Sequence, residues 1–164
     1  MAQKNHSRSF AIYLSLALAW SVPAFAQSLT ALEITGQTTP RVPVTLELNA
    51  LDELPQVEFT TSTIWTDGPV TFSGVPLKAL LGDLARGGST VEMVALNDYK
   101  VTMPLDQLED EVPIVATRMN GEPMSVRDKG PYWVVFPYDT DTKYQSEIVY
   151  AWSIWQLNRL KIVD

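Results

Sequence analysis

The chain has 164 residues, no cysteine and a single histidine, His6, and its 12 basic and 19 acidic side chains give a formal net charge of −7. Without cysteine, thiol nucleophiles and thiolate metal sites are excluded. The one histidine lies near the N-terminus, inside the segment expected to be removed, so we expect no imidazole-based catalysis. The acidic balance argues against a nucleic-acid partner, because such a surface repels the phosphate backbone. We expect neither a catalytic constellation nor a metal site.

Residues 1–26 have the pattern of a secretory signal peptide. Two basic residues precede an apolar run at residues 10–22 that is too short to span a bilayer, and Ala24-Phe25-Ala26 provides a small-x-small cleavage site. We expect cleavage after Ala26, which leaves one domain, residues 27–164, in a bacterial periplasm without a membrane span. A retained N-terminal anchor is the alternative.

The first half of that domain is expected to mix strands and short helices. Leu32 and Ile34 alternate with polar neighbours and predict a strand, and residues 56–65 are rich in β-branched and aromatic residues and predict another. Two short helices are expected, one over Leu48, Leu51 and Leu54 with Thr45 as its cap and Pro55 as its end, and one over Leu77, Leu80, Leu81 and Leu84 between Pro76 and Gly87-Gly88.

The second half reads almost entirely as strands. These cover residues 90–96, 99–103, 112–118, 132–136 and 153–163, with hairpin turns at Asn97-Asp98 and Asn120-Gly121. The last strand is expected to be bulged, because its apolar parity shifts between Leu157 and Leu160. The predicted class is α+β, a β-rich sandwich or barrel with two short helices.

Three motifs in this order resemble the molybdopterin-binding oxidoreductase domain, the central fold of sulfite oxidases. Residues 71–81 (TFSGVPLKALL) are similar to its aromatic-x-Gly-Val-Pro-Leu-x-x-Leu-Leu signature, residues 120–124 (NGEPM) to its Asn-Gly-x-Pro-Leu, and residues 130–137 (GPYWVVFP) to its Gly-x-Pro-x-Arg strand. The resemblance runs from about Leu29 to the C-terminus. It implies the sulfite oxidase-like fold.

A short, secreted, stand-alone branch of this superfamily is more similar still, in residues 95–99 (ALNDY), 124–131 (MSVRDKGP) and 153–157 (SIWQL). Members of that branch include periplasmic pterin-binding proteins that regulate a membrane-bound cyclic-di-GMP enzyme. The resemblance therefore implies a pterin ligand and, as a partner, the periplasmic region of a membrane sensor enzyme.

The chain departs from the catalytic relatives at three places. Their molybdenum-binding cysteine precedes the Gly-Val-Pro-Leu segment, where this chain has FTTSTIW (residues 59–65), with hydroxyls in place of the thiol. Their Lys-Trp pair, whose lysine helps to hold the cofactor phosphate, corresponds to Gln156 and Leu157, and their strand arginine corresponds to Trp133. We therefore expect a reduced pterin, in preference to molybdopterin, and a binding protein in preference to an enzyme. The alternative is a molybdenum-cofactor oxidoreductase that lacks the cysteine ligand.

A pterin is a flat polar bicycle, which needs an aromatic face for stacking, a carboxylate for its donor edge and donors for its acceptor edge. Candidates for these roles are Trp65 and Trp133 for stacking, Asp98 or Asp128 for the donor edge, Asn97, Arg127 and Lys129 for the acceptor edge, and Tyr99 beside the turn.

Each candidate also has a structural interpretation. Trp65 and Trp133 could belong to the core, Asn97 and Asp98 could simply form a turn, and Arg127 could lie in a solvated loop. Tyr150, Trp152 and Trp155 are interpreted as core or partner-interface residues.

Overall fold

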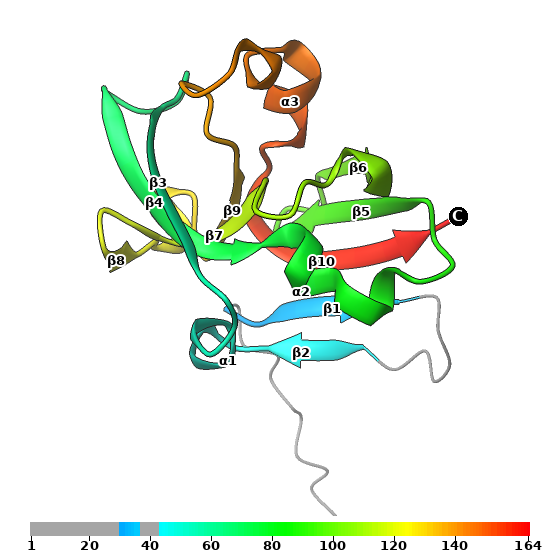
Figure 1. Cartoon of the computed structure of the whole chain (residues 1–164). Coiled ribbons are helices and arrows are strands. Elements are labelled where there is room, and N and C mark those ends of the chain that lie inside the picture. Colours follow the sequence, from blue (N-terminus) through cyan, green and yellow to red (C-terminus); the bar gives the residue numbers. More distant parts are fainter. Residues whose placement is uncertain (1–29, 37–42) are drawn as a thin grey trace, which may run out of the picture.

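The computed structural model describes residues 30–36 and 43–164 (Figure 1). The expected signal peptide, its cleavage site and His6 all lie outside these residues. No helix in the described ranges combines the length and apolarity needed to cross a bilayer.

In the described part of the chain, ten strands form one strongly curled sheet, which agrees with the predicted β-rich class (Figure 1). The strands are β1 Leu32–Thr35, β2 Val44–Leu46, β3 Val57–Ser62, β4 Pro69–Pro76, β5 Thr90–Ala95, β6 Lys100–Pro104, β7 Ile114–Met119, β8 Glu122–Pro123, β9 Tyr132–Val135 and β10 Trp155–Val163. The main path runs β2-β1-β10-β9-β7-β4-β3, while β5 and β6 attach to β10 and β8 attaches to β7. Among the strands of the described residues, only β1 and β10 pair in parallel. The result is a half-barrel with few short helices.

The helices are α1 Leu48–Asp52, α2 Leu77–Leu81 and α3 Glu147–Trp152, and 3-10 turns cover Gly82–Ala85, Leu105–Gln107, Val126–Asp128 and Thr142–Tyr144. The prediction missed α3, which is capped by the Ser146 hydroxyl accepting from the Val149 N–H. Its six residues are too few to show a helical period.

Two helix details in the sequence-based prediction are wrong. Thr45 does not cap α1, because it lies in β2 opposite Glu33, and the N-cap residue is Glu47. The second helix does not continue to Gly87, because Gly82 adopts a positive φ of 45° and the chain tightens into a 3-10 turn. A glycine in this conformation ends an α-helix at no steric cost.

The hairpin expectations hold with one change. Asn120 and Gly121 have φ of 53° and 84° and form a two-residue turn between Met119 and Glu122, as predicted. At Asn97-Asp98 the last paired strand residues are Val94 and Lys100, and the Ala95 N–H donates to the Tyr99 carbonyl. The turn therefore has three residues, 96–98, instead of two.

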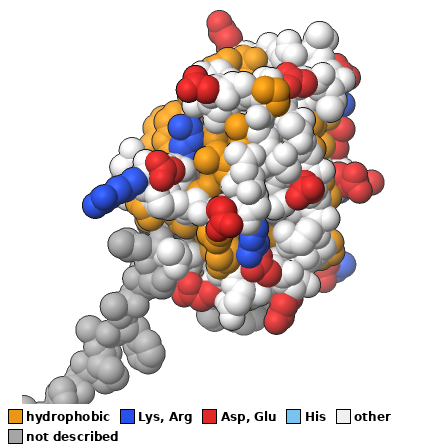
Figure 2. All heavy atoms as spheres, turned by 90° about the vertical axis from the view of Figure 1, so that its left-hand side faces the viewer, with side chains coloured by type: hydrophobic (Ala, Val, Ile, Leu, Met, Phe, Trp, Pro, Cys, Tyr) orange, Lys and Arg blue, Asp and Glu red, His pale blue; other side chains and the backbone are white. Residues whose placement is uncertain are grey.

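The core lies inside the curl of the sheet. Its largest fully buried side chains are Trp133, Tyr132, Phe72, Leu32, Ile34, Leu51, Leu77, Leu81, Met93, Met103, Ile114 and Leu157. Helix α1 is held to β7 by Arg118, which donates to both carboxylate oxygens of Asp52 at 2.5 and 2.7 Å and lowers the pKa of that carboxyl. Figure 2 shows one face of the molecule, where hydrophobic side chains reach the surface between acidic and basic ones.

The glycine of the Gly-Val-Pro-Leu segment has a packing reason. Gly74 crosses β7 opposite Ala116 at a register shift in the β4–β7 ladder. A Cβ on Gly74 would lie 2.1 Å from the Val115 carbonyl oxygen and 2.6 Å from the Ala116 Cα, so these backbones meet only because residue 74 has no side chain.

We expect Gly74→Ala to lower the free energy of unfolding by roughly 1–3 kcal/mol, because the clash is with backbone and β4 or β7 must move. Urea denaturation measures this change, and Ala79→Ser on the exposed side of α2 is the control. Equal stability of Gly74→Ala and the wild type would show that the two strands do not need this close approach.

Candidate functional site

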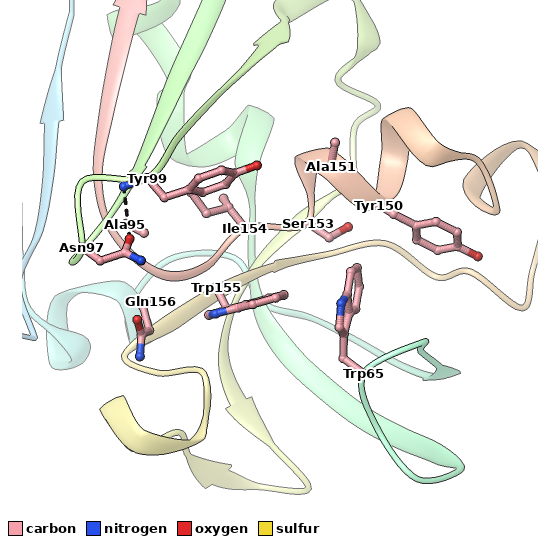
Figure 3. Close-up of a pocket in the computed structure, with 10 residues that line it drawn as sticks. All are labelled: Trp65, Ala95, Asn97, Tyr99, Tyr150, Ala151, Ser153, Ile154, Trp155 and Gln156. Atoms are coloured by element: carbon pink, nitrogen blue, oxygen red, sulfur yellow. Dashed lines mark hydrogen bonds between the residues drawn. The ribbon is translucent and has the colours of Figure 1, made fainter.

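A pocket of about 370 Å³ opens where four segments meet: the β3–β4 loop, the turn after β5, the end of α3 and the start of β10 (Figure 3). This volume lies in the range of small-molecule sites. The lining residues are Trp65, Ala95, Asn97, Tyr99, Tyr150, Ala151, Ser153, Ile154, Trp155 and Gln156. The lining is mostly apolar and aromatic, and it contains no charged side chain.

Trp65 forms one wall and is placed by its own loop. The Thr63 hydroxyl accepts from the Trp65 N–H at 3.0 Å and shares a 2.9 Å hydrogen bond with the Thr66 hydroxyl, which fixes a compact turn. The Trp65 ring then meets Tyr150 and Trp155 edge to face, with centroid distances of 5.8 and 5.7 Å. These three rings give the pocket flat aromatic walls.

Trp133 supports the site from behind. Its side chain is fully buried, its indole N–H donates to the Ser153 carbonyl at 3.1 Å, and its ring lies 5.8 Å from that of Trp65. The structure thus places Trp133 in the core, so the stacking surface expected of it is not exposed to a ligand. The alternation of side chains along β9 could not predict that Trp133 is buried, because all four residues of the strand are buried and neither face is exposed.

Ser153 is held in place by buried hydrogen bonds. The Tyr138 hydroxyl donates to the Ser153 hydroxyl at 2.6 Å, and that hydroxyl donates to the Val149 carbonyl at 2.8 Å. Burial raises the pKa of Tyr138 to about 12, so this phenol stays protonated near neutral pH. With both of its hydrogen-bonding roles used by the protein, Ser153 shapes the wall and has no base to activate it.

The turn residues divide between two surfaces. Asn97 and Tyr99 line the pocket, and the Asn97 side-chain oxygen accepts from the Tyr99 N–H at 3.1 Å. Asp98 turns away, adopts a φ of 62° and accepts from the Arg159 guanidinium at 2.5 Å, in a separate charged groove. The structure does not bring the Asp98 carboxylate into this pocket, so its expected role at the donor edge of a ligand stays a prediction.

The loop before β9 contributes less than expected. Arg127 is exposed and outside the lining, and Asp128 accepts from the Ser125 hydroxyl at 2.8 Å. Lys129 is half-buried, and its Nζ lies 5.5 and 5.9 Å from the ring centroids of Trp133 and Trp155. It approaches the aromatic wall as a cation without lining the pocket.

Seven of the ten lining residues are not among the predicted site residues, and those of them with aromatic or polar side chains are Tyr150, Ser153, Trp155 and Gln156. The sequence pattern places Tyr150 and Trp155 in the core or at a partner interface, since aromatic side chains are typical of both. Gln156 was noted only as a departure from the phosphate-binding lysine of catalytic relatives. No local pattern reveals that α3, which the prediction missed, brings Tyr150 next to Trp65, or that the start of β10 brings Trp155 there.

The pocket fits the ring part of a molybdopterin better than its metal part. In residues 59–65, Thr61 is fully buried and its hydroxyl accepts from the Asp139 N–H at 3.1 Å and donates to the Ser62 carbonyl at 3.3 Å. The Thr63 hydroxyl is used in the same way, because it accepts from the Trp65 N–H. These hydroxyls bond the protein itself, and the chain has no thiolate to replace them. The described residues contain no group of three His, Cys, Asp or Glu side chains that could hold a metal ion.

Comparison with known proteins places the fold. The chain is similar to the sulfane dehydrogenase SoxCD from Paracoccus pantotrophus, with 19% sequence identity and a TM-score of 0.61, over 84% of this chain and 39% of that one. It therefore spans about two fifths of the SoxCD chain. A search of curated proteins gives no significant match.

A family model provides the assignment. The model described as "Oxidoreductase molybdopterin binding domain" matches residues 19–143, more than half of the chain. The chain belongs to the oxidoreductase molybdopterin-binding domain family.

Proposed function

We propose that this protein binds a reduced pterin without using it for catalysis. The observation that carries the proposal is the aromatic pocket of about 370 Å³ in a molybdopterin-binding domain whose chain has no thiolate for molybdenum. A flat bicycle gains most from flat walls, and Trp65, Tyr150 and Trp155 provide three. The family membership supports a pterin-type ligand, and the bonded hydroxyls of Thr61 and Thr63 support the absence of a metal ligand.

A second candidate function is a molybdenum-cofactor oxidoreductase in which the metal is held only through the pterin dithiolene. The family to which the chain belongs favours it. The pocket lining gives this second function little support, because it contains no charged side chain that could bind the cofactor phosphate. Lys129 is the one cation whose contact with a lining ring is seen in the described part of the chain.

We further propose that the protein works in a bacterial periplasm as a ligand-dependent regulator of a membrane cyclic-di-GMP enzyme. The proposal rests on the resemblance to the secreted branch and on apolar side chains next to the pocket. Tyr99 and Trp155 are 54% and 39% exposed, and Ile64 and Ile148, close in sequence to Trp65 and Tyr150, are 64% and 56% exposed. Exposed large apolar side chains are typical of a surface that a partner covers.

Reduced pterins should quench the tryptophan fluorescence of the protein saturably, because Trp65 and Trp155 line the pocket. We expect Trp65→Ala to weaken binding roughly tenfold, through loss of one aromatic wall. Titration with 6-hydroxymethyl-7,8-dihydropterin measures both effects.

Trp152→Phe is the matched control for this titration. Trp152 is buried, donates to the Thr102 carbonyl and does not line the pocket, so this variant should bind like the wild type. An absence of saturable quenching in the wild type would contradict the proposed function and favour a domain whose pocket no longer binds a ligand.

The regulatory proposal makes a separate prediction. The immobilised periplasmic region of a cyclic-di-GMP enzyme encoded beside this protein should capture the pterin-loaded protein at least tenfold more tightly than the free protein. Ile148→Lys should abolish this capture, because Ile148 is exposed on the helix that carries Tyr150, and a charge there would oppose burial beneath a partner.

Val44→Lys is the control for capture, since Val44 is also exposed, at 38%, but lies on β2 and not beside the pocket. Equal capture with and without pterin, measured by surface plasmon resonance, would contradict ligand-dependent regulation.

A further inference from the structure

Gln156 is the extra residue of a β-bulge at the end of the pocket where Asn97 lies (Figure 3). In the β9–β10 ladder, Trp155 pairs with Trp133 and Leu157 with Tyr132, which leaves Gln156 without a partner residue. Its φ is 53°, an unfavourable conformation for a residue with a side chain, and such residues are often found at functional sites.

The bulge joins the two loops on either side of the pocket. The Gln156 N–H donates to the Lys129 carbonyl and the Gln156 carbonyl accepts from the Leu96 N–H, both at 2.9 Å. Residue 156 is therefore fixed between the turn that carries Asn97 and the loop that precedes β9.

Two side-chain amides at this end of the pocket have orientations set by backbone partners. The Asn97 Oδ1 accepts from the Tyr99 N–H at 3.1 Å, so the group left for a ligand is the Nδ2 donor. The Gln156 Nε2 donates to the Val126 carbonyl at 2.7 Å, so the atom left for a ligand is the Oε1 acceptor. Within residues 30–36 and 43–164, neither of these remaining atoms has a protein partner, and both residues line the pocket (Figure 3).

We infer that Asn97 Nδ2 and Gln156 Oε1 form a donor–acceptor pair that recognises the lactam edge of the pterin, its C4 carbonyl and N3–H. This inference rests on the proposed function and deepens it by naming the residues that determine specificity. A lactam presents an acceptor next to a donor, which is the complement of the pair left on the protein. Recognition then needs no carboxylate, in keeping with the placement of Asp98 and Asp128 outside the lining.

The pair discriminates by the cost of mismatched hydrogen bonds. A 2,4-diaminopteridine has an amino donor at C4 and an acceptor at N3, the reverse of the lactam pattern. Its C4 amino group would face the Asn97 donor and its N3 would face the Gln156 acceptor, so two polar groups in the pocket would be left unpaired. The wild-type protein should therefore prefer the pterin over the 2,4-diamino analogue with the same side chain by roughly tenfold to a hundredfold.

The test is a substitution that reverses one member of the pair. Asn97→Asp keeps the oxygen that accepts from the Tyr99 N–H and replaces the donor with an acceptor. Isothermal titration near neutral pH should show weaker pterin binding, by at least tenfold, and loss or inversion of the preference over the diamino analogue.

Asn120→Asp is the matched control, because the Asn120 Oδ1 also accepts from a backbone N–H, that of Thr71 at 3.1 Å, in a turn outside the pocket lining. It should leave the preference unchanged. If Asn97→Asp does not fold, Gln156→Met removes the acceptor and should reduce the preference to below about threefold.

The outcomes separate the two proposals. A wild-type protein that binds the pterin, with the same preference in Asn97→Asp and Gln156→Met, would overturn the inferred pair while the proposed function stands. A wild-type protein that binds neither pteridine would overturn the proposed function itself. Loss of preference in Asn97→Asp with retention in Asn120→Asp supports the pair.

Discussion

Strand β10 has two edges but pairs with three strands, β1, β5 and β9. Much of the site depends on the register shifts that these pairings require. Leu157 pairs with Ala95 of β5 and Tyr132 of β9, whereas Arg159 to Lys161 pair with β5 and β1. One edge is thus shared between β9 and β1. The register shifts that separate these pairings leave Gln156 and Asn158 as extra residues. Because Gln156 is released from the ladder, its backbone bonds the loops at Lys129 and Leu96, and the pocket forms beside it.

The sequence contained the signals for most of the sheet and for part of the site. Alternation and turn chemistry located seven of the ten strands in the described residues, together with the Asn120-Gly121 hairpin and the bulge between Leu157 and Leu160, whereas β2, β4 and β8 were not predicted. These features are local, since they depend on residues a few positions apart. Trp65, Asn97 and Tyr99, placed in the site by resemblance, do line the pocket. Whether they bind a pterin stays a prediction.

The remaining site features depend on contacts across the chain. Asp98 is directed away by Arg159, 61 positions later, and Trp133 is covered by Trp65 and Phe72 on a strand buried on both faces. Tyr150 reaches the pocket through α3, which has no sequence period of its own. Burial and side-chain direction at these positions are tertiary properties, so a pattern within one segment could not predict them.

The absence of cysteine matters most in one segment of this fold, the stretch before the Gly-Val-Pro-Leu segment. The stretch before the Gly-Val-Pro-Leu segment is built from hydroxyls that bond the backbone: Thr61 holds Asp139, and Thr63 orients Trp65. Residues in a region that would bind a metal in catalytic relatives here build the aromatic wall. This arrangement supports the proposal that the domain recognises a flat ring and leaves it chemically unchanged.

The most direct test of this account is to identify what the native protein carries. Protein purified from the periplasm of its own host would be analysed by mass spectrometry of the released small molecule and by elemental analysis of the same sample. The account predicts close to one pterin per chain and no molybdenum. Stoichiometric molybdenum together with a dithiolene-bearing molybdopterin would contradict it and identify the protein as a cofactor-loaded oxidoreductase.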